Sequence, residues 1–169
     1  MFVKLLSSGP QLGWAMGMSG GEVVEMEGIK LPKDLYYTER NLWVKPEPDG
    51  TVRIGFNDLA QQLIKKVVSV RFFPAGRKVR RGGIFGSVES AKWVERVRSP
   101  VAGTIVEVNE ELRRNPGLVN EDPYGRGWFV RIKPDSPEEL QQVLSELPHG
   151  DAVEEYLKEQ IKKFLKKEG

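Results

Sequence analysis

The stretch "VESAKWVERV", residues 88–97, predicts two short strands joined by a tight turn, with Lys92 at the tip of that turn. Ala91 and Trp93 flank the lysine, and Glu89 lies three residues before it. Most exposed lysines serve only as solvated charges. A lysine held out by two stiff strands also suits covalent attachment of a cofactor, because an attaching enzyme can reach the ammonium while only the added arm moves. We therefore treat Lys92 as a candidate attachment site.

Short β-rich runs separated by turn residues surround this stretch on both sides. The clearest of them are "IFGSVES" (84–90) and "TIVEVN" (104–109). Nearer the N-terminus, "PEPDG" separates "LWVK" (42–45) from "TVRIGF" (51–56), which predicts a hairpin. Many short strands with frequent turn residues are typical of a barrel or a sandwich. The sequence therefore predicts a mainly β fold.

A few helices are predicted beside the strands. Asn57 or Asp58 can cap a short helix over residues 57–64. Ser136 is the expected cap of a later helix, with Pro137 at its first position and Glu139 as the capping-box acid. The last helix is predicted over residues 151–167, and its apolar side chains share one face: Val153, Tyr156, Leu157, Ile161, Phe164 and Leu165.

The composition is that of an ordinary globular protein. The 169 residues are 39% hydrophobic and 30% charged, with a net charge of +2, so no strong electrostatic case exists for a nucleic acid or a membrane partner. There is no cysteine, which excludes disulfides, cysteine nucleophiles and thiolate metal sites. With His149 as the only histidine, neither a metal site nor a histidine triad is expected. No run is long enough to span a bilayer, and the cytoplasm is the default location.

No set of residues predicts a catalytic centre. The carboxylates of Asp58, Glu89 and Glu95 fall on different elements, so nothing pairs them for acid–base work. The paired basic residues can form a docking surface but more often form a solvated face; they are Lys65–Lys66, Arg80–Arg81 and Arg113–Arg114. The glycines at 82, 83 and 86 lack a dinucleotide-binding spacing and indicate a turn with close strand packing.

Three longer segments resemble one known family. They are "YYTERNLWVKPEPDGTVRIGFNDLAQ", "GSVESAKWVERVRSPVAGTIVEVNEEL" and "NPGLVNEDPYGRGWFVRIKP". Together they are similar to the H protein of the glycine cleavage system over residues 36–145. The resemblance implies a mainly β fold of the lipoyl-domain type, a flattened barrel or sandwich of two sheets (a barrel-sandwich hybrid) with short helices and an amphipathic C-terminal helix. The predicted organisation is an N-terminal extension (1–35), a lipoyl domain (36–147) and the C-terminal helix (148–169).

The resemblance also implies a covalent cofactor. Lys92 corresponds to the lysine that carries lipoate, with Glu89 and Trp93 as flanking recognition residues. Ala91 and Trp93 stand where a biotinylated relative would be expected to have methionines, which favours lipoate. A lipoyl protein of this type is a carrier rather than an enzyme, and it has no catalytic residue of its own.

The expected partners follow from the same resemblance. A lipoate ligase or a lipoyl transferase would attach the cofactor. In glycine cleavage, a pyridoxal-dependent glycine decarboxylase loads an aminomethyl group onto the arm and a folate-dependent aminomethyltransferase removes it. Dihydrolipoyl dehydrogenase then reoxidises the dithiol, whose cyclic disulfide opens and closes easily.

Several positions depart from the family pattern. Ordinary members have His-Glu-Trp where this chain has Asn41-Leu42-Trp43, and a histidine where it has Leu59. Arg96 stands where an acid is expected. Leucine cannot accept a hydrogen bond from an ammonium, and an arginine attracts anions. A load cleft formed by Leu42, Leu59 and Arg96 would therefore suit a neutral or anionic load better than an aminomethyl amine.

These departures favour a divergent branch of the family. The "ES-x-KWV" run and "LPKDLYY" (31–37) are similar to lipoate-binding proteins that carry sulfur species for a heterodisulfide-reductase-like complex in sulfur oxidation. The first alternative is ordinary aminomethyl carriage in glycine cleavage. The second is a relative without lipoate that docks partners through its basic face and terminal helix.

Overall fold

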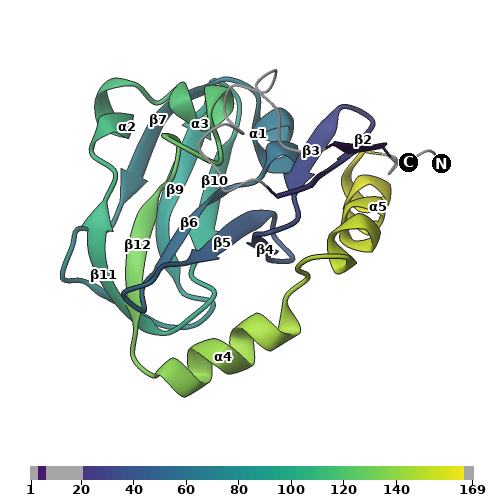
Figure 1. The fold of residues 1–169 in the computed structure, drawn as a ribbon. Helices are drawn as coiled ribbons and strands as arrows, with labels where there is room; N and C mark the ends of the chain where they lie inside the picture. The colour runs from purple at the N-terminus through teal and green to yellow at the C-terminus, as the bar shows by residue number, and fades with distance from the viewer. Residues whose placement is uncertain (1–3, 7–20, 166–169) are drawn as a thin grey trace.

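The structure is a computed structural model that describes residues 4–6 and 21–165. It is mainly β, with short helices at the periphery, and has the lipoyl-domain-like barrel-sandwich fold predicted from the sequence. Figure 1 shows the strands as stacked layers, with α4 (Pro137–Glu146) beneath them and α5 (Ala152–Phe164) along one side.

Two sheets form the barrel-sandwich. The smaller has the strand order β10-β9-β7 and the larger the order β4-β5-β6-β12-β11-β8. The smaller sheet consists of β7 (Val67–Phe72), β9 (Ile84–Ser90) and β10 (Val94–Arg98). The larger consists of β4 (Tyr36–Tyr37), β5 (Leu42–Pro46), β6 (Val52–Phe56), β8 (Lys78–Val79), β11 (Gly103–Val108) and β12 (Val130–Pro134). Every strand pairing within these sheets is antiparallel.

The main core lies between the two sheets. Alternate residues of each strand point inward, as the period of two in a strand requires. Ile54 of β6, Val88 of β9, Ile105 of β11 and Ile132 of β12 are all completely buried in this cluster. Gly86 on β9 allows close strand approach, because a Cβ there would lie 2.3 Å from the Arg71 carbonyl oxygen of β7.

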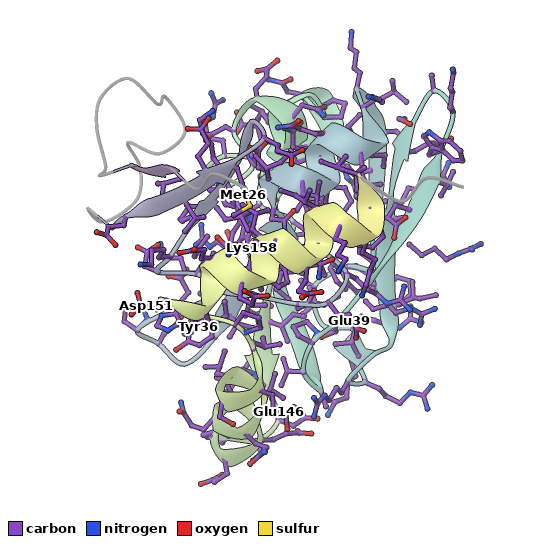
Figure 2. All side chains as sticks on the ribbon, turned by 90° about the vertical axis from the view of Figure 1, so that its right-hand side faces the viewer. Met26, Tyr36, Glu39, Glu146, Asp151 and Lys158 are labelled. Carbon is purple, nitrogen blue, oxygen red and sulfur yellow. The ribbon has the colours of Figure 1, made fainter. Side chains whose placement is uncertain are left out.

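A second core joins the end of the chain to its beginning. The strands β1 (Lys4–Leu6), β2 (Val23–Met26) and β3 (Ile29–Pro32) form a third sheet. Helix α5 packs on that sheet, and Figure 2 shows the helix crossing this side of the molecule close to Met26. The cluster contains Met26, Leu31, Trp43 and Leu157, which are all at most 1% exposed. The described part of the predicted N-terminal extension is therefore packed, while the three domain boundaries remain predictions.

The helix-capping residues predicted from the sequence cap helices in the structure. Asn57 caps α1 (Asp58–Ile64) by accepting from Ala60 N at 2.9 Å, and Ser136 caps α4 by accepting from Glu139 N at 3.1 Å. Two further helices of one turn each are α2 (Glu111–Arg114) and α3 (Leu118–Glu121). The apolar face of α5 is buried only as far as Ile161, and Phe164 at 42% exposure turns toward a surface cavity.

Candidate functional site

The Lys92 turn lies at the end of the β9–β10 hairpin. Val94 is paired with Glu89, and beyond this pair Ser90 N donates to Trp93 O at 2.9 Å while Trp93 N donates to Ser90 Oγ at 3.2 Å. Only Ala91 and Lys92 remain in the turn, and both are exposed. The two hydrogen bonds fix the ends of a two-residue turn, so the lysine is presented to solvent by a stiff support.

The hairpin is held by its inward-facing residues. Val88 is completely buried, Ser90 is 5% exposed and Val97 is 2% exposed. Burial of an apolar side chain of this size contributes about 1.5–3 kcal/mol. The strands therefore stay on the core while the turn itself stays accessible.

The two flanking residues point to different sides of the hairpin. Glu89 is exposed and accepts a hydrogen bond from Ser69 Oγ at 3.0 Å, so its carboxylate lies over the outer face of β7. Trp93 is 61% exposed and lines a cavity on the other side. Both residues are accessible to an enzyme that approaches the turn, and their role in recognition stays a prediction.

A cavity of about 290 Å³ lies directly beside the Lys92 turn. Its walls come from the end of the hairpin, from α1, from the end of α5 and from the segment between β4 and β5. They are lined by Glu39, Arg40, Asn41, Phe56, Ala60, Leu63, Ile64, Trp93, Val94, Glu95 and Phe164. Aliphatic and aromatic side chains dominate this lining, which suits a hydrocarbon arm.

Two carboxylates lie at this cavity, and neither was predicted from the sequence to be part of a load site. Glu39 and Glu95 both line it and are both exposed, with Arg40 beside Glu39. Carboxylates accept hydrogen bonds from a protonated amine. The available signal was the charged turn "TERN" at residues 38–41, but the linear sequence does not show that this turn lies beside the hairpin.

The predicted load cleft of Leu42, Leu59 and Arg96 is not formed. Leu42 is 2% exposed and Leu59 is completely buried, so both are core residues. Arg96 lines a different cavity, with Arg71 and Ser87. The reason is the alternation of β10, where Val97 points into the core and Arg96 points away from it.

A buried polar network supports the wall formed by Asn41. Asn57 Nδ2 donates to Asn41 Oδ1 at 3.1 Å, and the Tyr156 hydroxyl donates to the Thr38 carbonyl oxygen at 2.7 Å. Burial raises the pKa of Tyr156 well above its ordinary value, so the phenol stays neutral. Asn41 has a positive φ of 66°, a conformation that asparagine tolerates better than most residues. The network therefore fixes the turn that carries Glu39.

Other kinds of site are not found in the described part of the chain. Within residues 4–6 and 21–165, no cluster of three or more histidine, aspartate or glutamate side chains could hold a metal ion. No helix among the same residues is long and apolar enough to cross a membrane. His149 stacks on Tyr36 with ring centroids 4.2 Å apart.

The fold and the presented lysine define a carrier protein of the lipoyl-domain class. The family model described as glycine cleavage H-protein matches residues 35–160. The chain belongs to this family, as the resemblance predicted, and the proteins of the family are carriers with lipoate on a lysine rather than catalysts.

Named relatives and a solved structure agree with this membership. "Glycine cleavage system H protein 3" of Aquifex aeolicus is 42% identical over 142 residues, which cover 83% of this chain and 88% of the relative. "Probable glycine cleavage system H protein 2" of Saccharolobus solfataricus is also 42% identical, over 82% of this chain and 93% of the relative. The crystal structure of a glycine cleavage system H protein from Mycobacterium marinum superposes with a TM-score of 0.64 at 30% identity, over 76% of this chain and 98% of that chain.

Proposed function

We propose that this chain is a lipoyl carrier that bears its cofactor on Lys92 and carries the aminomethyl group of glycine between enzymes. The observation that supports the proposal most is the exposed lysine on a two-residue turn beside a cavity that holds Glu39 and Glu95. The named relatives support the same pathway, because their names are those of glycine cleavage H proteins.

The residues around the turn fit a lipoyl arm. Lys92 supplies an accessible amine, and the hydrogen bonds between Ser90 and Trp93 hold it in place. Trp93, Val94 and Phe164 give apolar surface on which a hydrocarbon chain can rest. When attached, lipoate supplies a cyclic disulfide that a nucleophile opens and that can close again.

The charged groups of the cavity fit a cationic load. The exposed carboxylates of Glu39 and Glu95 can accept hydrogen bonds from a protonated amine, and the apolar residues of the same cavity can contact the hydrocarbon arm. Arg40 lines the same cavity. These two acids would take the place of the acid that is absent at Leu42.

The sulfur-carrying interpretation loses its main support. It rested on the likeness of "ES-x-KWV" and "LPKDLYY" to the divergent branch and on a cleft of Leu42, Leu59 and Arg96, but two of these residues are buried and the third faces another side. The comparisons name glycine cleavage proteins, which favours aminomethyl carriage. A docking protein without lipoate differs from both, because it would not need an accessible lysine at position 92.

Loading by a glycine decarboxylase tests the proposal. The lipoylated chain is mixed with the decarboxylase and glycine, and the aminomethyl group on a sulfur of the lipoyl arm is followed by intact mass. We expect loading of the wild type and about tenfold faster loss of the load from Glu39→Gln/Glu95→Gln, since a charged hydrogen bond contributes about 1.5–3 kcal/mol. Glu155→Gln/Glu159→Gln, on exposed positions of α5, is the matched control. Absence of loading in the lipoylated wild type would contradict the proposal.

A further inference from the structure

Positive charge is concentrated in one part of the chain. Residues 65–98 hold ten lysines and arginines and two acidic residues, a net charge of +8, whereas the whole chain has a net charge of +2. This segment contains β7, β9 and β10, which form the smaller sheet (Figure 1). On the three strands themselves the basic residues are Arg71, Arg96 and Arg98 and the acidic ones are Glu89 and Glu95, so most of the positive charge of the segment lies in its connections, in β8 and in the Lys92 turn.

The outer face of this sheet carries a row of three neighbouring side chains. Ser87 of the central strand β9 is paired with Arg96 of β10 on one side and with Arg71 of β7 on the other. The three residues line one shallow cavity of about 230 Å³, and both arginines are exposed. Phe73 and Ile84 border the same cavity, so the surface is basic with an apolar margin.

Of the ten other arginines among the described residues, five pair with a carboxylate and five do not. Outside residues 65–98, Arg53, Arg113, Arg126 and Arg131 each pair with a carboxylate. Neither Arg71 nor Arg96 makes an ion pair with any residue that the structure describes. Glu89 lies on the same face, but its carboxylate accepts from Ser69.

Like charges on one face of a sheet repel each other, although solvent and salt screen most of this repulsion between exposed groups on non-adjacent strands. Arg71 and Arg96 lie on the two edge strands of the sheet, one residue away from each other across Ser87. Nothing in the fold requires arginines at these exposed positions. Because neither guanidinium has a carboxylate partner among the described residues, both are available to carboxylates of another protein.

The row is placed close to the proposed arm. Arg96 follows Lys92 by four residues on the same hairpin, which corresponds to about 13 Å along an extended strand. An enzyme that docks on the row would therefore have Lys92 near the edge of its contact surface. The arm could then enter an active site just beyond that edge.

We propose that the row of Arg71, Ser87 and Arg96 is the docking surface for an acidic protein surface beside the active-site entrance of the enzyme that loads the arm. The inference rests on the proposed function. Arginine forks bind carboxylates in a bidentate manner, and Ile84 can contact apolar side chains between the acids, whereas one face of the Phe73 ring is covered by the Arg77 guanidinium 4.1 Å away. Opposite charges would also speed the encounter of carrier and enzyme.

A charge-reversal experiment tests the docking surface. The KM of glycine decarboxylase for the lipoylated chain is measured at low and high salt for the wild type and for Arg71→Glu/Arg96→Glu. We expect about a tenfold higher KM for the variant at low salt with an unchanged kcat, because steering charges act on encounter. High salt should raise the wild-type KM toward that of the variant.

Lys45→Glu/Lys133→Glu is the matched control, since both lysines are exposed on the larger sheet. Equal lipoylation of all three proteins at Lys92 shows that the turn and the fold are intact. If the double charge reversal does not fold, Arg71→Gln/Arg96→Gln replaces it, with an expected rise of about threefold in KM.

Three results would overturn the inference, and they can be told apart. A variant KM within twofold of the wild type, with the wild type loaded normally, removes the docking surface and leaves the proposed function standing. Loss of binding to phosphatidylglycerol vesicles or to a DNA duplex in that variant, with KM unchanged, would assign the surface to another class of partner. A lipoylated wild type that is not loaded at all removes the proposed function, and the docking inference with it.

Discussion

The hydroxyl group of Tyr156 on α5 makes hydrogen bonds to two segments of the barrel, one at Thr38 and one at Asn57. This hydroxyl donates to the Thr38 carbonyl oxygen at 2.7 Å and accepts from Asn57 Nδ2 at 3.4 Å. The side chain is only 8% exposed, and its ring stacks on Tyr37 with centroids 5.4 Å apart. One residue of α5 thus helps to fix the turn that carries Glu39.

We expect Tyr156→Phe to lower the free energy of unfolding by about 1–2 kcal/mol, because Thr38 O and Asn57 Nδ2 lose a buried partner. Urea unfolding followed by tryptophan fluorescence measures the difference. Tyr36→Phe is the matched control: its ring stacks on His149, and its hydroxyl makes no hydrogen bond to a described residue, so the change should stay within about 0.5 kcal/mol. Equal stability of Tyr156→Phe and wild type would show that the network does not hold the helix.

At the scale of elements, turn and capping residues correctly predicted the structures that depend only on neighbouring residues. The hairpin β5–β6, the cap at Ser136 and the turn at Lys92 each depend on a few neighbouring residues, and the structure shows all three. The packing of α5 on β2 and β3 was not predicted, because it joins residues from opposite ends of the chain. An amphipathic helix shows that a face is buried but not which surface covers it.

The load site, too, depends on contacts between distant parts of the chain, which the sequence did not predict. Leu42, Leu59 and Arg96 were all assigned to a cleft from their place in the family pattern. Their true orientation depends on which way β5, α1 and β10 turn in the assembled fold, and no short stretch of sequence contains that information. Glu39 and Glu95 could not be paired from the sequence, because a turn and a hairpin meet only in three dimensions.

At the scale of the whole molecule, the second core contains several neutral phenols. Tyr37 is completely buried, and Tyr124 and Tyr156 are 7% and 8% exposed. Burial raises the pKa of each of the three well above its ordinary value. This core joins the β2–β3 hairpin, α5 and the barrel, so ionisation of the phenols would act on all three together.

We expect the molecule to lose stability at alkaline pH. An unfolded tyrosine ionises near pH 10, while the buried ones resist ionisation, so their contribution is complete below about pH 10 and is lost as the pH rises further. Each buried tyrosine should add about 1.4 kcal/mol per pH unit to the slope above that point. Urea unfolding at a series of pH values measures how the free energy of unfolding falls with pH. Tyr156→Phe should reduce this slope by the contribution of one tyrosine, about 1.4 kcal/mol per pH unit. A stability independent of pH above 10 would contradict the expected burial of the phenols.

The central claim is that Lys92 is an attachment point and not an ordinary surface charge. Intact mass after incubation with a lipoate-attaching enzyme, lipoate and ATP tests it most directly, with Lys78→Ala as the control because that lysine is also exposed. We predict the mass of one lipoyl group on the wild type and on Lys78→Ala, and none on Lys92→Ala. No increase on the wild type, or an increase that persists in Lys92→Ala, would contradict the account.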